Sequence, residues 1–227
     1  MGASKRNEVE VVRAKCYKCY RPVSSCVCSH VKPVETKTKF VILMHPKEFQ
    51  KVKNGTGHMT HLSLPNSELY VGVDFRDHSR VNALLEDETK VCYVLYPGAE
   101  SHRLNENKIE LSGRELVIFI IDATWSTAEK LLKVSTNLQV LPKLSFTHTK
   151  SSQFQIKEQP ADYCLSTIES TLTILELLNS HEMEDLKEGA LQQFLEPFQA
   201  MIKYQISCIA SSKSEHKNAV RFKRREA

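Results

Sequence analysis

The feature that most constrains the fold of this chain is a run of six apolar residues, Leu116–Ile121, that ends at Asp122 and precedes a helical pattern. A buried strand that leads into a helix after a short turn is a βα unit. Segments of both kinds recur after Thr36: strands are predicted at Phe40–Met44, Leu69–Val73, Val91–Tyr96, Leu116–Ile121 and Gln139–Leu141, and helices at Ser79–Glu86, Ser126–Val134, Ser166–Leu178 and Leu186–Ser207. Because these strands are apolar and β-branched, we expect both of their faces to be buried, as in a parallel sheet. The predicted fold class is therefore α/β.

The composition agrees with a globular protein. The chain has 227 residues, of which 41% are hydrophobic and 26% are charged. This length suits one main domain with a small appendage. A membrane-spanning helix needs about 20 apolar residues, and the longest apolar runs, Phe40–Met44 and Leu116–Ile121, are far shorter. No secretion signal is recognised at the start of the sequence. We therefore expect a cytoplasmic protein without a membrane partner, and we expect it to be a monomer.

Four cysteines, Cys16, Cys19, Cys26 and Cys28, lie in the stretch CYKCYRPVSSCVC with the spacing C-x2-C-x6-C-x-C. Two close pairs separated by a short loop can place four thiolates around one tetrahedral Zn²⁺. The alternative is two disulfides, which need an oxidising compartment, and nothing in the sequence indicates export. Zinc is therefore favoured. It would be structural, because a module of about 35 residues is too small to fold on its own apolar core.

Composition divides the chain into three parts: a cysteine-rich module at 1–35, the α/β domain at 36–210 and a basic tail at 211–227. Six basic residues but only one carboxylate, Glu215, lie between Lys213 and Arg225. Such a cluster suits a polyanion such as RNA. The alternative for a charged tail is a solvated, frayed terminus.

Four polar stretches follow predicted strands or open a predicted helix: HPKE at His45–Glu48, LYPG at Leu95–Gly98, DATW at Asp122–Trp125 and LSTIE at Leu165–Glu169. In parallel sheets, ligands bind beyond the carboxyl ends of the strands. We therefore expect these stretches to gather around one site. No dinucleotide-binding GxGxxG fingerprint and no P-loop are recognised in the sequence.

Each polar residue also has a purely structural interpretation. Asp122 would serve as the N-cap of the helix that follows it, and Trp125 as a core anchor. Ser166 and Glu169 have the spacing of a capping box. These structural roles do not explain why four polar turns should occur at one edge of the sheet.

Taken together, the motifs resemble the DTW-domain family, whose signature reads Asp122-Ala123-Thr124-Trp125 here. The resemblance runs in sequence order from the four cysteines to about residue 178. It includes HPKE, GTG with LSLPNS, LYPG, DATW, LPK, SSQFQIKEQP and LSTIE. Any one of these motifs is weak, but the ordered set is specific.

The resemblance implies a tRNA-uridine aminocarboxypropyltransferase. Members of this family transfer the 3-amino-3-carboxypropyl group of S-adenosylmethionine to N3 of a uridine in tRNA. It also implies a SPOUT-like, knotted α/β domain whose cofactor pocket is built from loops, which agrees with the missing glycine fingerprint. The co-substrate would be S-adenosylmethionine, the structural metal Zn²⁺ and the partner tRNA.

The same resemblance suggests roles for the polar turns. Asp122 is expected either to take the N3 proton of uridine or to orient the amino group of the cofactor, with Thr124 and Trp125 beside it as further catalytic residues. The expected cofactor-binding residues are Leu95, Tyr96, Pro97, Gly98, Ile121, Asp122, Thr124, Trp125, Leu165, Ser166, Thr167 and Glu169. Two alternatives stay open: an RNA methyltransferase of similar fold, and a zinc-knuckle protein that binds RNA without catalysis.

Overall fold

The computed structural model describes residues 14–50, 55–148, 152–153 and 165–215. The described chain contains a six-stranded sheet with the order β2-β1-β5-β3-β6-β4, in which every pair of neighbours is parallel. The strands are β1 (Lys39–Met44), β2 (Ser67–Val71), β3 (Lys90–Leu95), β4 (His102–Arg103), β5 (Glu115–Asp122) and β6 (Lys143–Ser145). The predicted parallel α/β fold is confirmed.

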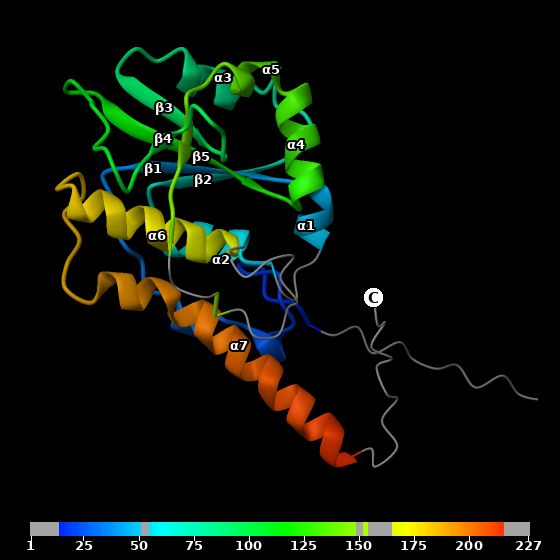
Figure 1. The fold of residues 1–227 in the computed structure, drawn as a ribbon. Helices are drawn as coiled ribbons and strands as arrows, with labels where there is room; N and C mark the ends of the chain where they lie inside the picture. Colours follow the sequence, from blue (N-terminus) through cyan, green and yellow to red (C-terminus); the bar gives the residue numbers. More distant parts are fainter. Residues whose placement is uncertain (1–13, 51–54, 149–151, 154–164, 216–227) are drawn as a thin grey trace, which may run out of the picture.

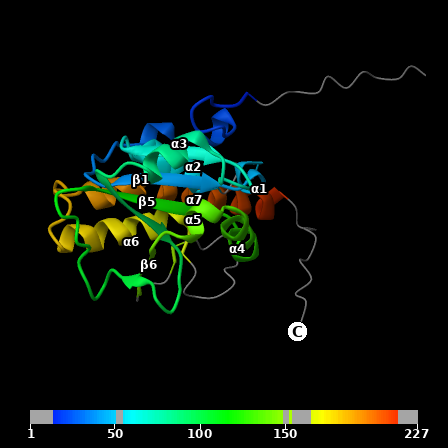
Figure 2. The same ribbon diagram turned by 90° about the horizontal axis from the view of Figure 1, so that it is seen from above.

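Helices cover both faces of this sheet (Figure 1). The helices are α1 (Pro46–Gln50), α2 (Gly57–Ser63), α3 (Ser79–Leu85), α4 (Trp125–Val134), α5 (Thr136–Gln139), α6 (Thr167–Ser180) and α7 (Ala190–Glu215), with 3-10 turns at Val23–Ser25 and Cys28–His30. Helices α3, α4 and α5 lie on one face, and α2, α6 and α7 lie on the other (Figure 1). Figure 2 shows the molecule from above, with β1 and β5 side by side in the sheet. None of the described helices is both long enough and apolar enough to cross a bilayer.

The central strand β5 is apolar along almost its whole length because both of its faces are buried. Val117 and Phe119 are fully buried in the core cluster with α3 and α4 side chains. Leu116, Ile118 and Ile120 point to the other face and join the cluster that contains α6 and α7. Because neighbouring side chains of a strand point to opposite faces, a sheet covered on both sides needs apolar residues at every position.

One predicted strand, Gln139–Leu141, is wrong. The chain there leaves α5, whose single turn buries Leu138 and leaves Val140 83% exposed. The strand of this region, β6, begins only at Lys143, directly after Pro142. A three-residue strand carries too little periodicity to be recognised from the sequence.

The cysteine-rich module packs against the main domain. Cys19, Val27 and Val34 belong to the same buried cluster as Phe198 and Met201 of α7. The guanidinium of Arg21, which is 2% exposed, donates to the carbonyl of Gly55 at 3.3 Å and contacts Met201 Sδ at 3.1 Å. The boundary at residue 35 stays a prediction, and residues 216–227 of the predicted basic tail lie outside the described residues.

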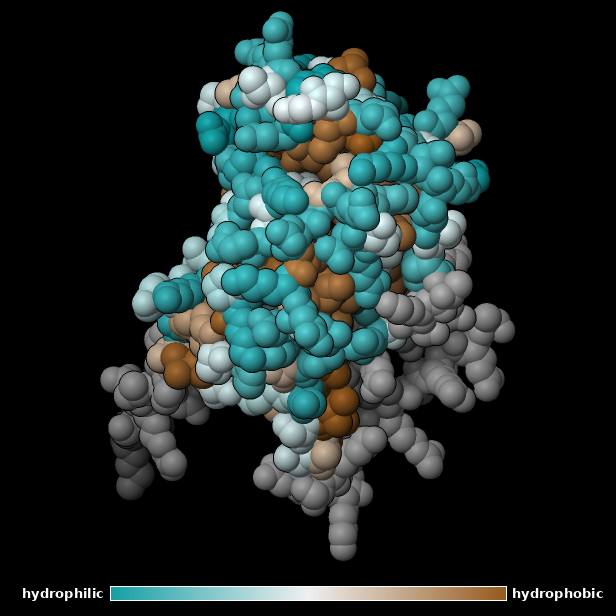
Figure 3. Space-filling model, turned by 90° about the vertical axis from the view of Figure 1, so that its left-hand side faces the viewer, coloured by the Kyte–Doolittle hydropathy of each residue, from teal (hydrophilic) through white to brown (hydrophobic). Residues whose placement is uncertain are grey.

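The face on the left of Figure 1 is shown in Figure 3. Over the residues that are coloured there, hydrophilic side chains cover most of the surface and apolar ones appear in small patches (Figure 3). The opposite end of the sheet, where α1 and α4 lie, holds the features described next (Figure 1).

Candidate functional site

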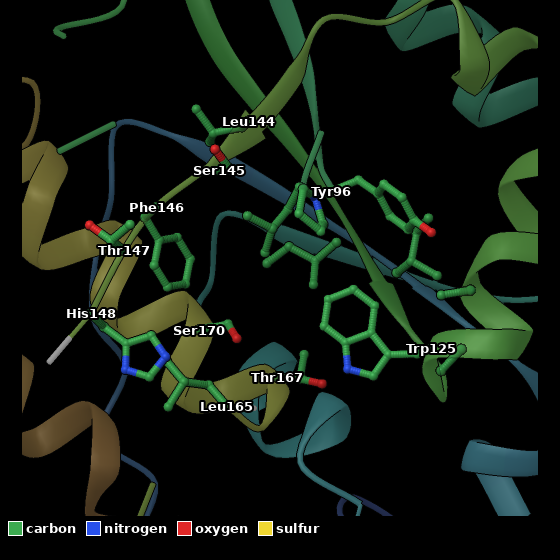
Figure 4. Close-up of a pocket in the computed structure, with 16 residues that line it drawn as sticks. Tyr96, Trp125, Leu144, Ser145, Phe146, Thr147, His148, Leu165, Thr167 and Ser170 are labelled. Atoms are coloured by element: carbon green, nitrogen blue, oxygen red, sulfur yellow. The ribbon is translucent and has the colours of Figure 1, made fainter. Parts of the chain in front are cut away.

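A cavity of about 470 Å³ opens beyond the carboxyl ends of β3, β5 and β6. Its walls come from the turns after these three strands and from the first turns of α4 and α6 (Figure 4). The lining residues are Leu95, Tyr96, Pro97, Ile120, Ile121, Ala123, Trp125, Ala128, Leu144, Ser145, Phe146, Thr147, His148, Leu165, Thr167 and Ser170. The position agrees with the rule that ligands of parallel sheets bind at the carboxyl ends of strands.

Aromatic rings line opposite sides of the cavity. In Figure 4, Trp125 and Tyr96 lie on one side, and Phe146 and His148 lie on the other. Trp125 is 51% exposed and meets the Tyr96 ring edge-on at 6.3 Å between centroids. This exposure excludes the alternative that Trp125 is a core anchor. Burial raises the pKa of the Tyr96 phenol, so this ring is neutral at physiological pH.

Asp122 is the last residue of β5 and is 9% exposed. Its Oδ1 accepts a hydrogen bond of 2.6 Å from the hydroxyl of Thr167 at the start of α6. The N-cap of α4 is Thr124, whose carbonyl accepts from Thr127 and Ala128. The interpretation of Asp122 as the cap of this helix is therefore wrong, because its carboxylate joins β5 to α6 instead.

Helix α2 approaches the same carboxylate from the other side. A Cβ on Gly57, the first residue of α2, would lie 2.2 Å from Asp122 Oδ2 and 2.7 Å from the terminal methyl of Met44. Only glycine allows the backbone to come this close. The backbone N–H of His45, in the predicted HPKE stretch, donates to the carbonyl of Asp122 at 3.0 Å.

The predicted capping box at the start of α6 is confirmed. The carboxylate of Glu169 accepts hydrogen bonds from the backbone N–H of Ser166 at 2.9 Å and from its hydroxyl at 2.6 Å. It also accepts from the hydroxyl of Ser152 at 2.9 Å and from the N–H of Gln153 at 2.6 Å. Glu169, which is 6% exposed, thus joins Ser152 and Gln153 to the start of α6.

The structure brings together three of the four predicted stretches. Leu95, Tyr96, Pro97, Ile121, Trp125, Leu165 and Thr167 line the cavity. The other residues predicted at the site, Gly98, Asp122, Thr124, Ser166 and Glu169, are neighbours of the lining residues in sequence but are absent from its wall. The sequence interpretation missed the wall formed by Phe146, Thr147 and His148. The only signal for it is the motif LPK, whose last residue, Lys143, begins the unrecognised strand β6.

The four cysteines form a separate cluster. All four Sγ atoms lie within 4.8 Å of one another, and the pairs Cys16–Cys28 and Cys19–Cys26 are 3.7 Å apart. A disulfide would bring two sulfurs to about 2 Å, whereas four sulfurs bound to zinc at about 2.3 Å stand about 3.8 Å apart. The cluster therefore fits a tetrahedral zinc ion. Hydrogen bonds from the backbone of Cys19 and Lys18 lower the pKa of the Cys16 thiol to about 6, whereas burial and the neighbouring thiols raise the pKa of Cys28. The zinc interpretation therefore rests on the positions of the four sulfurs.

Comparison with known proteins identifies the family to which the chain is similar. The family model of the DTW domain matches residues 13–206. Proteins named tRNA-uridine aminocarboxypropyltransferase 2 are 28% identical over 199 residues in Mus musculus and 30% identical over 202 residues in Macaca fascicularis. Each match covers 86% of this chain, which spans 64% of the length of those two relatives.

A relative of the same name in Drosophila melanogaster is 30% identical over 201 residues, which cover 86% of this chain and 76% of the relative. No solved structure matches the chain significantly. The matched region contains the four cysteines, the strands that end at the cavity and the DATW motif. The chain therefore belongs to the DTW domain family.

Proposed function

We propose that this protein is a tRNA-uridine aminocarboxypropyltransferase, which transfers the 3-amino-3-carboxypropyl group of S-adenosylmethionine to N3 of a uridine in tRNA. The observation that carries the proposal is the meeting of the LYPG, DATW and LSTIE stretches at one cavity, beside the buried carboxylate of Asp122. Family membership and the names of the relatives support the same activity.

The cavity suits S-adenosylmethionine in size and chemistry. Pockets for small ligands have volumes of about 300–1,000 Å³ and are mostly apolar, and this cavity has about 470 Å³. Trp125, Tyr96 and Phe146 offer ring faces for the adenine or the uracil. Backbone groups of Leu95–Gly98 and Leu165–Thr167 would hold the adenosine. When bound, S-adenosylmethionine supplies a carbon activated by its sulfonium.

Asp122 is the residue proposed to act on the reactants, either as the base for uridine N3 or by orienting the amino group of the donor. Uridine N3 must lose its proton near the moment of attack, and a carboxylate within hydrogen-bond reach can take it. Thr167 holds Oδ1 at 2.6 Å and Oδ2 lies against Gly57, so the orientation of the carboxylate is fixed. If the carboxylate instead orients the amino group of the donor, the same fixed geometry selects which carbon faces the uridine. Thr124 and Trp125 lie on the same turn and would position the base.

The uridine itself must be unpaired. N3 lies on the Watson–Crick edge, so the base has to come from a loop or be flipped out of a helix. The remaining elements of the proposal are a knotted, SPOUT-like topology, a structural zinc ion at the four cysteines, a monomeric state and a cytoplasmic location. The parallel sheet and the cavity built from turns rather than from a glycine-rich loop support the topology.

One labelling experiment tests the reaction. The protein is incubated with bulk tRNA and S-adenosylmethionine labelled in its carboxyl group, and the RNA is then isolated. Aminocarboxypropyl transfer carries the label into the RNA, whereas methyl transfer leaves it on the small-molecule product. Asp122→Asn serves as the matched control and is expected to abolish incorporation. Methylated RNA without carboxyl label would support the methyltransferase alternative, and tRNA binding without any transfer would support the non-catalytic one.

A further inference from the structure

A second groove lies between the cysteine-rich module and the main domain. It has a volume of about 380 Å³ and is lined by Lys18, Tyr20, Phe49, His58, His61, Leu62, Leu69 and Val71. These residues come from the cysteine loop, from α1 and α2 and from β2. None of the lining residues is acidic, and Lys18 contributes a cation at the rim.

Three rings form the centre of this groove. The ring centroid of Tyr20 lies 5.0 Å from that of His58 and 5.7 Å from that of Phe49, and the latter two rings are 5.3 Å apart. Tyr20 is nevertheless 44% exposed, so part of its ring faces the solvent. Within the described residues, His58 Nε2 is buried and has no hydrogen-bond partner. The groove therefore offers an open aromatic surface, to which the exposed part of the Tyr20 ring belongs.

The cysteine loop holds Tyr20 in an unusual conformation. Its φ is 58°, in the left-handed region that bulky residues rarely adopt. The loop enforces this conformation through a hydrogen bond from the N–H of Tyr20 to the carbonyl of Cys16 at 2.8 Å and one from the N–H of Cys16 to the carbonyl of Arg21 at 2.8 Å. Residues held in such sparsely populated conformations cluster at active sites and ligand clamps, and here the held residue presents an exposed ring.

The groove adjoins the candidate active site. Gly57 touches the carboxylate of Asp122, and the next residue, His58, lines the groove. Val71 is the last residue of β2, so the groove lies at the carboxyl end of the sheet, as the cavity does. In Figure 1, α1 and α4 lie at this same end. A strand of RNA whose uridine enters the cavity would bring its neighbouring nucleotides towards the groove.

We propose that this groove binds a second unpaired nucleotide of the RNA substrate, whose base stacks on Tyr20 and whose phosphate is attracted by Lys18. Single-stranded RNA is held by base stacking on aromatic rings and by cations along its backbone, which are the two features present here. The inference rests on the proposed function, because it takes RNA as the substrate of the neighbouring cavity.

The test compares Tyr20→Ala with Tyr17→Ala. Tyr17 belongs to the same loop, is 82% exposed and is not part of the groove wall, so it is a matched control. Loss of one base–aromatic stack is expected to weaken tRNA binding about tenfold or more. Fluorescence anisotropy with labelled tRNA measures this binding. In turnover assays, KM for tRNA should rise while kcat stays within about twofold, and S-adenosylmethionine binding and zinc content should be unchanged.

Two further results separate the possible outcomes. Lys18→Glu changes an exposed side chain at the rim and should also weaken tRNA binding, with a smaller salt dependence. If Tyr20→Ala does not fold, the tRNA affinity of Lys18→Glu still tests whether the groove binds RNA. Wild-type tRNA affinity in both folded variants, with transfer intact, would overturn the second nucleotide site and leave the proposed function standing. If both variants bind RNA more weakly but the wild-type protein never transfers the labelled group, the nucleotide site would stand and the proposed function would be overturned.

Discussion

The hydroxyl of Thr167 donates a hydrogen bond of 2.6 Å to Asp122 Oδ1 and thereby joins two residues 45 positions apart in the chain. Asp122 ends the central strand β5, and Thr167 opens helix α6. Thr167 itself lines the cavity, so the bond connects the carboxylate of Asp122 to a residue of the cavity wall. This relationship makes Thr167 a positioning residue in the proposed reaction.

Replacing Thr167 with valine keeps the shape of the side chain but removes the donor. A hydrogen bond to a charged group contributes about 1.5–3 kcal/mol, which corresponds to a loss of kcat of about 10- to 150-fold. Thr167→Ser keeps the hydroxyl and should retain most of the activity. The measurement is incorporation of the labelled aminocarboxypropyl group into tRNA. Full activity of Thr167→Val would show that the bond does not matter for the reaction.

The indole of Trp125 gives a direct signal for ligand binding. It is the only tryptophan of the chain, is 51% exposed and lines the cavity. Binding of S-adenosylmethionine should cover the indole and change its fluorescence in a saturable way. Trp125→Phe should lose the signal and, because the ring contact with Tyr96 is reduced, bind the donor several-fold more weakly. Binding by equilibrium dialysis with no change in tryptophan emission would place the donor elsewhere.

The zinc content of the protein and of a cysteine variant tests whether the four cysteines bind a metal. The protein should contain about one zinc ion per chain, measured by elemental mass spectrometry. Cys28→Ser should lose most of the metal and unfold at a lower temperature, because a small module depends on its zinc for stability. Cys208→Ser, at an exposed thiol of α7, is the control and should change neither quantity. Isolation of the protein with two disulfides and no metal would contradict the zinc interpretation.

The contribution of Glu68, on β2, to the stability of the fold is expected to depend on pH. Although burial acts to raise its pKa, hydrogen bonds from Arg80, Tyr70 and Lys39 and the charge of Lys39 lower it from 4.5 to about 2. The unfolded carboxyl therefore binds a proton at a higher pH than the folded one. Its stabilisation is fully present above about pH 4.5 and is lost as the pH falls towards about 2.

Glu68→Gln should accordingly lower the free energy of unfolding near neutral pH, and the difference from the wild type should shrink at about pH 3. Urea unfolding at the two pH values measures it. A difference of the same size at both would show that the charge of Glu68 does not stabilise the fold. Glu106→Gln, whose ion pair with Arg103 is exposed on both sides, is the control and should have little effect.

The local sequence pattern was sufficient to predict those features of the protein that depend on residues close together in the chain. The apolar runs predicted β1, β3 and β5 to within one or two residues, because strands buried on both faces need apolar residues at every position. The cysteine spacing predicted the four-sulfur cluster, and the spacing of Ser166 and Glu169 predicted the capping box. The order of motifs pointed to the family that the comparison shows.

Tertiary structure alone decided which partners the polar residues have in distant parts of the chain. Nothing near Asp122 in sequence indicates that its carboxylate bonds Thr167 rather than capping α4, since that contact depends on how α6 packs against β5. The wall of Phe146 and His148 follows a strand that is too short to recognise. The groove at Tyr20 depends on how the cysteine loop packs on the domain, through Arg21 and through the apolar contacts of Cys19. Such contacts join residues far apart in the chain, so no local pattern records them, whereas strands, caps and metal ligands follow from spacing.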